Sequence, residues 1–173
     1  MFSVPHRRIA HLPEREDHGI DADGAFAEYV RIPESNIWKI DPAIPADYAS
    51  VLDPLGNAVH TVLAGEVAAK TVAIVGCGPI GLFSIAVARA VGAAQVFAIE
   101  INEHRAELAR KMKADYVLNP AKEDVKKIVF EATGGVGVDV VLEMSGKTPG
   151  IRLGFDILRL GGASRCSAFP PSQ

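Results

Sequence analysis

The stretch VAIVGCGPIGL, residues 72–82, joins an apolar run to three closely spaced glycines and then to a helical pattern. The apolar run, residues 72–75, lacks polar alternation, which is typical of a strand that is buried on both faces of a parallel sheet. Gly76, Gly78 and Gly81 fill the pattern GxGxxG directly after this run. The stretch therefore predicts a buried strand, a tight turn and the first turn of a helix.

Short apolar or β-branched runs alternate with helical patterns beyond this turn. The expected strands are residues 72–75, 96–99, 116–118, 138–142 and 163–169, and the expected helices are residues 79–91, 103–112, 123–132 and 149–160. Strands without polar alternation need cover on both faces, which helices on either side of a parallel sheet provide. The sequence therefore predicts an α/β fold with a doubly wound, Rossmann-like parallel sheet of about five strands.

The region before this alternation has a different character. Residues 1–18 are polar, contain three histidines and show no regular period, so we expect an irregular arm. Further on, the apolar residues of 26–32 share one parity and NIWKI follows at 36–40, which predicts two short strands of a β-rich unit. Residues 45–65 have helical apolar spacing and are expected to form two helices that meet near Pro54 and Gly56.

Composition and charge exclude several classes of function. The chain has 173 residues, 49% of them hydrophobic, and a formal net charge of -3, so nothing indicates nucleic-acid binding. No apolar run approaches the roughly 20 residues of a membrane-spanning helix. The N-terminus lacks the apolar core of a secretory signal, and Cys77 and Cys166 form neither a disulfide framework nor a CxxC pair. We therefore expect a cytoplasmic protein with no membrane partner.

An acidic residue follows the second expected strand. Glu100 lies 19 residues after Gly81, where the GxGxxG fingerprint of dinucleotide-binding domains places an acid. Such a carboxylate accepts hydrogen bonds from ribose hydroxyls and would repel the 2'-phosphate of NADP, so the pattern favours NAD. Other interpretations stay open: a purely structural glycine turn, a solvated strand end at Glu100, and an Arg105 that either pairs with Glu100 at the surface or turns toward a phosphate.

Several stretches together resemble a known family. They are DGAFAEYVRIP (23–33), LDPLGNAVHTVLAG (52–65), VAIVGCGPIGL (72–82), NEHRAELARKMKADYVLNPAKED (102–124) and GVGVDVVLEMSG (135–146). They resemble the zinc-dependent medium-chain alcohol dehydrogenases, and most closely the L-threonine 3-dehydrogenases. The resemblance begins near Gly19 and weakens after Gly162, and the arm before Gly19 matches nothing in it.

The resemblance implies a set of cofactor contacts in this chain. It places NAD against Gly76, Gly78, Pro79, Ile80, Gly81, Glu100, Arg105, Asn57, Ser167, Ala168 and Phe169. The glycine turn would hold the pyrophosphate, and Glu100 and Arg105 would hold the adenosine end. Asn57 would lie near the nicotinamide carboxamide, and residues 167–169 beside the nicotinamide ring.

The resemblance also implies a reaction, in which zinc polarises a secondary alcohol and hydride passes to NAD. A catalytic zinc needs about three protein ligands, and Asp53 alone occupies a position that the family uses for one. Asp53 can equally be a helix-capping or outer-shell acid, and His60 is either a packed core histidine or a further polar group beside the nicotinamide. We therefore expect no catalytic residue and no bound zinc in this chain.

After the irregular arm at 1–18, the resemblance predicts two regions: a remnant of a β-rich, GroES-like catalytic domain at 19–55, and a dinucleotide-binding domain at 56–173 that lacks its last strand. An open fifth strand would invite pairing with another chain, so we expect a homo-oligomer. The expected function is the NAD-binding part of an oxidoreductase of secondary alcohols, most like L-threonine 3-dehydrogenase. A catalytically silent NAD-binding fragment and a related polyol or alcohol dehydrogenase are the alternatives.

Overall fold

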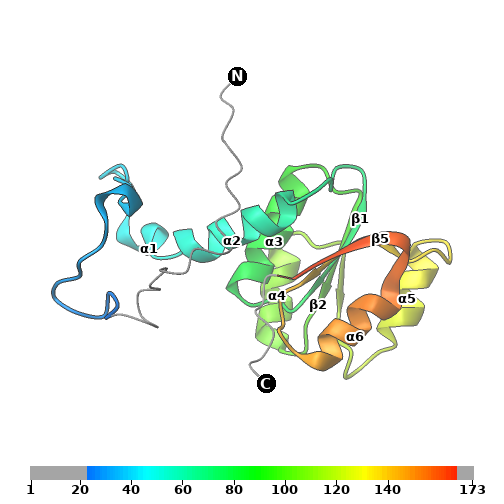
Figure 1. The fold of residues 1–173 in the computed structure, drawn as a ribbon. Coiled ribbons are helices and arrows are strands. Elements are labelled where there is room, and N and C mark those ends of the chain that lie inside the picture. Colours follow the sequence, from blue (N-terminus) through cyan, green and yellow to red (C-terminus); the bar gives the residue numbers. More distant parts are fainter. Residues whose placement is uncertain (1–22, 167–173) are drawn as a thin grey trace. The chain divides into compact units, whose positions relative to one another are not determined.

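A computed structural model of the chain describes residues 23–166 (Figure 1). The chain divides into two compact units, Met1–Ile44 and Pro45–Gln173. No helix among the described residues is long and apolar enough to cross a membrane.

The first unit contains little regular structure in its described part, residues 23–44. Its one element is the short 3-10 helix η1 (Glu34–Asn36). The two strands predicted over 26–32 and 36–40 are not formed, so this prediction is wrong. A strand requires a hydrogen-bonded neighbour, and Phe26, Tyr29 and Trp38 lie exposed instead of packing on a second strand.

The second unit alternates strands and helices after two initial helices. In chain order its elements are α1 (Ala46–Ala49), α2 (Leu52–Leu63), β1 (Thr71–Val75), α3 (Pro79–Ala90), β2 (Gln95–Ile99), α4 (Glu103–Lys111), β3 (Tyr116–Leu118), α5 (Val125–Ala132), β4 (Val138–Glu143), α6 (Thr148–Ile157) and β5 (Leu158–Cys166). The alternation predicted from the sequence is confirmed for every strand and every helix after the glycine turn.

The break between the first two helices lies earlier than predicted. Helix α1 ends before Ser50, and α2 begins at Leu52 and continues through Pro54 and Gly56. Pro54 is the third residue of α2, where its missing N–H is one that the first turn leaves without a partner in any case. The proline is therefore compatible with the helix, and the prediction of a break at Pro54 and Gly56 is wrong.

The five strands form one parallel sheet in the order β3-β2-β1-β4-β5. Its central strand is β1, where Ala73 lies between Phe97 of β2 and Val141 of β4. This is the order of a doubly wound sheet, so the predicted fold class is confirmed. The last strand begins at Leu158, five residues before its predicted start, because α6 ends at Ile157 and an irregularity near Val138 lets β5 pair earlier.

Successive residues of a strand are buried on opposite faces of the sheet, in two separate hydrophobic cores. Val72 and Ile74 of β1 belong to the core beneath α2, α3 and α4, whereas Ala73 and Val75 belong to the core beneath α5 and α6. Figure 1 shows α3 and α4 on one side of the sheet and α5 and α6 on the other. All four side chains are at most 3% exposed. Cover on both faces is the physical reason that the strands carry uninterrupted apolar runs.

Helix α2 is fastened to the far edge of the sheet by Arg165 of β5. Its guanidinium donates hydrogen bonds to the carbonyl oxygens of Val62, at 2.8 Å, and Glu66, at 3.4 Å. A cation at this end of the helix also opposes the negative pole of the helix dipole. Desolvation lowers the pKa of Arg165 below its ordinary value.

Asp139 joins the starts of β1 and β4. Its Oδ2 accepts hydrogen bonds from the N–H and the hydroxyl of Thr71, both at 2.8 Å, and Nε of Arg159 lies 3.0 Å from Oδ1. Burial by itself raises the pKa of this carboxyl. The hydrogen bonds from Thr71 and the charge of Arg159 outweigh burial and hold the pKa below its ordinary value.

We predict that Asp139→Asn lowers the free energy of unfolding at pH 7 by about 1–3 kcal/mol, the range for hydrogen bonds to a charged group. Because the pKa is lower in the folded state, the carboxylate stabilises the protein above its unfolded pKa of about 3.9 and loses this effect as the pH falls through the folded pKa. Urea unfolding at pH 7 and at a pH well below the unfolded pKa measures both effects. The exposed Glu131→Gln is the control, with an expected change below about 0.5 kcal/mol. A difference that grew in acid would contradict the prediction.

Candidate functional site

The glycine turn leads directly from the central strand into a helix. Gly76 continues the ladder after β1, donating its N–H to the carbonyl of Ile99 at 2.8 Å, and has a φ of +91°. Gly78 is the N-cap of α3 and Pro79 is its first residue, where a proline is well suited. No side chain caps this helix. The first-turn N–H groups of α3 therefore remain available to an external acceptor.

The space around each of the three glycines is different. A Cβ on Gly81 would collide with the carbonyl oxygen of Gly76, so Gly81 lets α3 lie close to the turn. A Cβ on Gly76 would lie 2.8–2.9 Å from the backbone nitrogen, Cα and Cβ of Ser145. A Cβ on Gly78 would meet nothing within 4 Å. Gly76 and Gly81 are therefore required by the fold itself, whereas Gly78 faces open space at the helix N-terminus.

Glu100 fastens the turn from the neighbouring strand. It follows β2, is 6% exposed, and its Oε2 accepts a hydrogen bond from the N–H of Cys77 at 2.8 Å. Its Oε1 accepts another from the N–H of Asn102 at 2.8 Å. Charged acceptors make strong hydrogen bonds with backbone amides. Glu100 is therefore a structural support of the glycine turn, a role that its spacing in the sequence did not predict.

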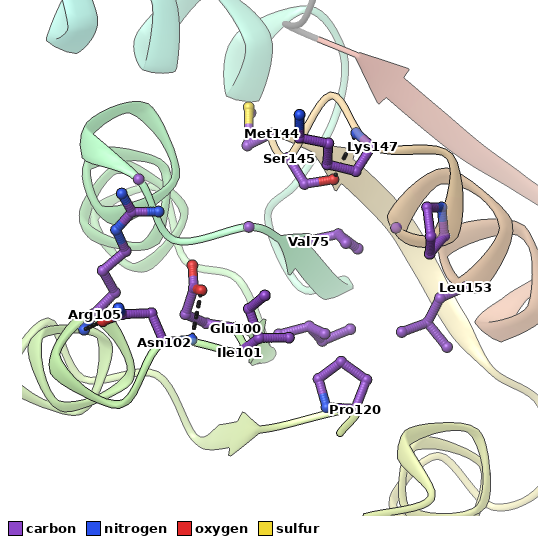
Figure 2. A pocket seen from close by; sticks show the side chains of 15 residues that line it. Val75, Glu100, Ile101, Asn102, Arg105, Pro120, Met144, Ser145, Lys147 and Leu153 are labelled. Atoms are coloured by element: carbon purple, nitrogen blue, oxygen red, sulfur yellow. Dashed lines mark hydrogen bonds between the residues drawn. The ribbon is translucent and has the colours of Figure 1, made fainter. Parts of the chain in front are cut away.

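A pocket of about 690 Å³ lies beside the turn, at the carboxyl ends of the strands. Figure 2 shows Glu100, Asn102 and Arg105 on one side of it and Ser145, Lys147 and Leu153 on another, with Pro120 below. Gly76 and Gly78 also line it. The crevice at the carboxyl ends of strands on either side of the central strand is where doubly wound sheets bind ligands.

Two of the pocket residues belong to the start of α4. Asn102 is the N-cap of this helix, and its Oδ1 accepts a hydrogen bond from the N–H of Arg105 at 3.1 Å. The ion pairs among the described residues do not include one between Arg105 and Glu100. The guanidinium of Arg105 therefore lines the pocket without being paired to the acid that supports the turn.

The predicted cofactor residues other than Asn57 separate into three groups. Gly76, Gly78, Glu100 and Arg105 line one pocket. Pro79, Ile80 and Gly81 form the first turn of α3 next to it. Ser167, Ala168 and Phe169 lie outside the described residues.

Asn57 and Asp53 lie together on α2. The Nδ2 of Asn57 donates to the carbonyl oxygen of Asp53 at 3.2 Å and to its Oδ2 at 3.4 Å. Both residues are exposed, and so is His60 near the end of the helix, which excludes the packed core position considered for it. Within residues 23–166, no group of three His, Cys, Asp or Glu side chains is arranged to hold a metal ion.

The loop after β4 contributes residues that the sequence analysis did not single out. Met144, Ser145 and Lys147 line the pocket, and the buried Glu143 precedes them at the end of β4. The sequence carried a usable signal, because Glu143 follows an uninterrupted apolar run just as Glu100 does. An acid at the carboxyl end of a buried strand is costly unless it has hydrogen-bond donors nearby.

Cys77 lies inside the turn without exposure to solvent. Burial, followed by the negative charge of Glu100, raises the pKa of its thiol to about 12. A thiol with this pKa is protonated at neutral pH and is a poor nucleophile. Cys77 therefore acts as a small side chain in the turn.

The chain is similar in sequence to known dehydrogenases. Residues 79–173 match the family model described as zinc-binding dehydrogenase. The chain is 48% identical over 155 residues to an L-threonine 3-dehydrogenase of Caldanaerobacter subterraneus subsp. tengcongensis, covering 90% of this chain and 45% of the relative. It is 52% identical over 143 residues to that of Symbiobacterium thermophilum, covering 83% of this chain and 41% of the relative. The chain thus spans less than half the length of these relatives.

Solved structures share the fold. An alcohol dehydrogenase from Thermus sp. ATN1 aligns with a TM-score of 0.77 and 31% identity, over 84% of this chain and 43% of that one. A zinc-binding dehydrogenase from Sinorhizobium meliloti 1021, bound to NADP, aligns with a TM-score of 0.81 and 29% identity, over 90% of this chain and 47% of that one.

We predict that Gly81→Ala destabilises the protein by about 1–3 kcal/mol, the usual cost of overpacking, because its Cβ would collide with the Gly76 carbonyl. Gly78→Ala is expected to change stability by less than about 0.5 kcal/mol, since its Cβ meets open space. Urea denaturation measures both. Gly56→Ala, which also adds a Cβ in open space but in the middle of α2, is expected to be neutral or stabilising. Equal losses at residues 78 and 81 would refute the assignment of separate roles.

Proposed function

Since the chain belongs to the family of zinc-binding dehydrogenases, we propose that it binds NAD through the glycine turn and supplies the cofactor-binding part of a dehydrogenase of secondary alcohols. The region from 56 to 173 is then the dinucleotide-binding domain, and 19–55 belongs to the catalytic domain. Bound NAD would supply the hydride acceptor for an alcohol carbon, and the residues of this chain would bind and orient it.

The observation that carries the proposal is the open space at Gly78. Two glycines of the turn are filled by protein atoms, and the third faces a pocket at the N-terminus of an uncapped helix of 12 residues. Backbone N–H groups and the positive pole of a helix form a site for phosphate groups. The turn therefore fits the pyrophosphate of a dinucleotide, with the first-turn amides of Ile80 and Gly81 as donors.

Glu100 supports NAD over NADP as the cofactor. Its carboxylate is held in place by the amides of Cys77 and Asn102, so it cannot move away from a ligand without releasing the turn. Each oxygen retains a second lone-pair direction that a ribose hydroxyl can use. A 2'-phosphate at the same position would place a second negative charge beside it. Arg105, on the adjacent wall, is free to contact the adenosine half from the other side.

The catalytic metal does not fit the described part of this chain. Asp53 lies beside Asn57 on an exposed face of α2, and residues 23–166 hold no group of three potential ligands. We therefore propose that Asp53 is the one residue of the described chain at a position that the family uses for a zinc ligand. This observation favours a second candidate function, an NAD-binding unit without turnover of its own. L-threonine is the proposed substrate of a complete enzyme, since the relatives above are L-threonine 3-dehydrogenases, with other secondary alcohols or polyols as alternatives.

The edge of β5 bears on the assembly of the chain. Strand β5 ends the sheet order and pairs only with β4 among the described residues, and its Leu160 is fully exposed. Unpaired strand edges readily pair with further chains. We propose a homo-oligomer, whose mass light scattering of the purified chain at high concentration can check; a clean monomer would contradict it. A cytoplasmic location is proposed separately.

We predict that the full chain binds NADH and that NADPH binds at least about tenfold more weakly, because of the fixed charge of Glu100. Gly78→Ala should fold normally and weaken NADH binding by about tenfold or more, since the new methyl group would occupy the space next to the helix amides. NADH fluorescence titration measures both affinities. Gly56→Ala, remote from the turn, is the matched control and should bind like the wild type. A wild-type chain that did not bind NADH would refute the proposal.

We predict that the chain forms no NADH from NAD and L-threonine, with or without added zinc, because the described residues lack a metal site. Absorbance at the NADH band measures the reaction, with the Caldanaerobacter L-threonine 3-dehydrogenase as the positive control. Zinc-dependent turnover by this chain would show that its own residues suffice and would favour the first candidate function over the second.

A further inference from the structure

Glu143 is a buried carboxylate that no step above uses. It ends β4 and is 3% exposed, beside Val75 in the sheet register. None of the ion pairs among the described residues includes it. A buried carboxylate without a cation must be stabilised by hydrogen-bond donors.

Those donors come from the loop that follows β4. The Oε1 of Glu143 accepts hydrogen bonds from the N–H of Ser145, at 3.0 Å, and from the Ser145 hydroxyl. The Oε2 accepts one from the N–H of Gly146 at 3.1 Å. Three donors from two consecutive residues therefore converge on one carboxylate, which holds this loop in a tight turn before α6.

The same loop touches the glycine turn. Ser145 lies where a side chain on Gly76 would be, and the N–H of Met144 donates to the carbonyl of Val75 at 2.8 Å. Met144, Ser145 and Lys147 line the pocket, whereas Glu143 is not among its lining residues. Figure 2 shows Ser145 and Lys147 above Val75, on the wall across from Glu100. A shift of Ser145 would therefore change both the pocket wall and the support of the phosphate turn.

We propose that Glu143 is a positioning residue for the bound dinucleotide: through Ser145 and Gly146 it fixes the β4–α6 loop as one wall of the cofactor pocket. The inference rests on the proposed function, because it concerns the same pocket. Glu143 does not touch the cofactor. It acts by keeping Ser145 against Gly76.

A carboxylate is the group that this arrangement requires. The thiol of Cys166 on β5 is a fourth donor, with its Sγ 3.8 Å from Oε2. All four groups are donors, and a carboxylate offers only acceptors. A glutamine would direct its NH₂ group at the N–H of either Ser145 or Gly146. Gly150 encloses the pair from α6, because a Cβ there would collide with the Ser145 hydroxyl and lie 3.2 Å from Oε1 of Glu143.

When Glu143 is replaced, the positioning role predicts a different change in NADH affinity from the two simpler roles of a buried acid. If Glu143 acted only through its negative charge, its removal would strengthen the binding of an anionic dinucleotide. If it served only the stability of the fold, its removal would leave the affinity of folded protein unchanged. Positioning predicts weaker binding, because the pocket wall loses its fixed conformation.

The experiment is NADH fluorescence titration of the full chain, under conditions in which urea curves show every variant to be folded. Glu143→Gln removes the charge and one acceptor, and Glu143→Asp keeps the charge but shortens the side chain that reaches Ser145 and Gly146. We expect each variant to bind NADH about tenfold more weakly than the wild type. Two controls match them in burial. Val129→Ala removes core volume under α5, and Gly154→Ala adds a methyl group one turn further along α6, 2.9 Å from the Val141 side chain. Both controls should lose stability and retain wild-type affinity.

Each result of the titrations either supports or contradicts the positioning role of Glu143. Unchanged or tighter NADH binding by Glu143→Gln overturns the positioning role, even though the wild type binds. If Glu143→Gln does not fold, Glu143→Asp decides alone, with unchanged affinity against the proposal and weaker affinity in its favour. If Val129→Ala and Gly154→Ala weaken binding equally, the effect reflects general stability and the proposal fails. A wild-type chain that does not bind NADH overturns the proposed function and this inference with it.

Discussion

The close approach of Gly81 to the carbonyl oxygen of Gly76 is the constraint on which the site depends. It brings the first turn of α3 against the end of β1, because neither residue has a side chain to separate them. The helix therefore begins directly above the end of the central strand. Its uncapped amides then point into the crevice between β2 and β4. A larger residue at either position would move the helix and the amides together.

Two acids flank this turn in similar ways. Glu100 ends β2 and binds the amides of Cys77 and Asn102, and Glu143 ends β4 and binds donors of Ser145 and Gly146. Each is buried, and each is compensated by backbone or hydroxyl dipoles. Because β2 and β4 are the two neighbours of β1, one carboxylate binds the glycine turn and the other binds the loop that packs against it. Two walls of the pocket are thereby held in one conformation, and such preorganisation reduces the entropy that any ligand must lose on binding.

The sequence was sufficient for those features that depend on neighbouring residues. The strand, turn and helix around Gly76 follow from local apolar patterns, and Glu100 follows from a fixed spacing within one βαβ unit. The contact of Glu100 with Cys77 and that of Ser145 with Gly76 could not be predicted, because they join residues that only the folded sheet brings together. The prediction of a helix break at Pro54 was wrong because a sequence pattern does not distinguish a proline in the first turn of a helix from a proline that ends one.

Helix α2 carries polar residues and is held by the sheet of the second unit. Its polar residues Asp53 and Asn57 are the ones that the family resemblance assigns to metal and nicotinamide, yet the helix is held by the sheet of the second unit. Arg165 of β5 binds its C-terminal carbonyls, and Ala58 and Val62 are buried in the core that it shares with α3. The position of Asn57 is therefore set by the same sheet that positions the glycine turn.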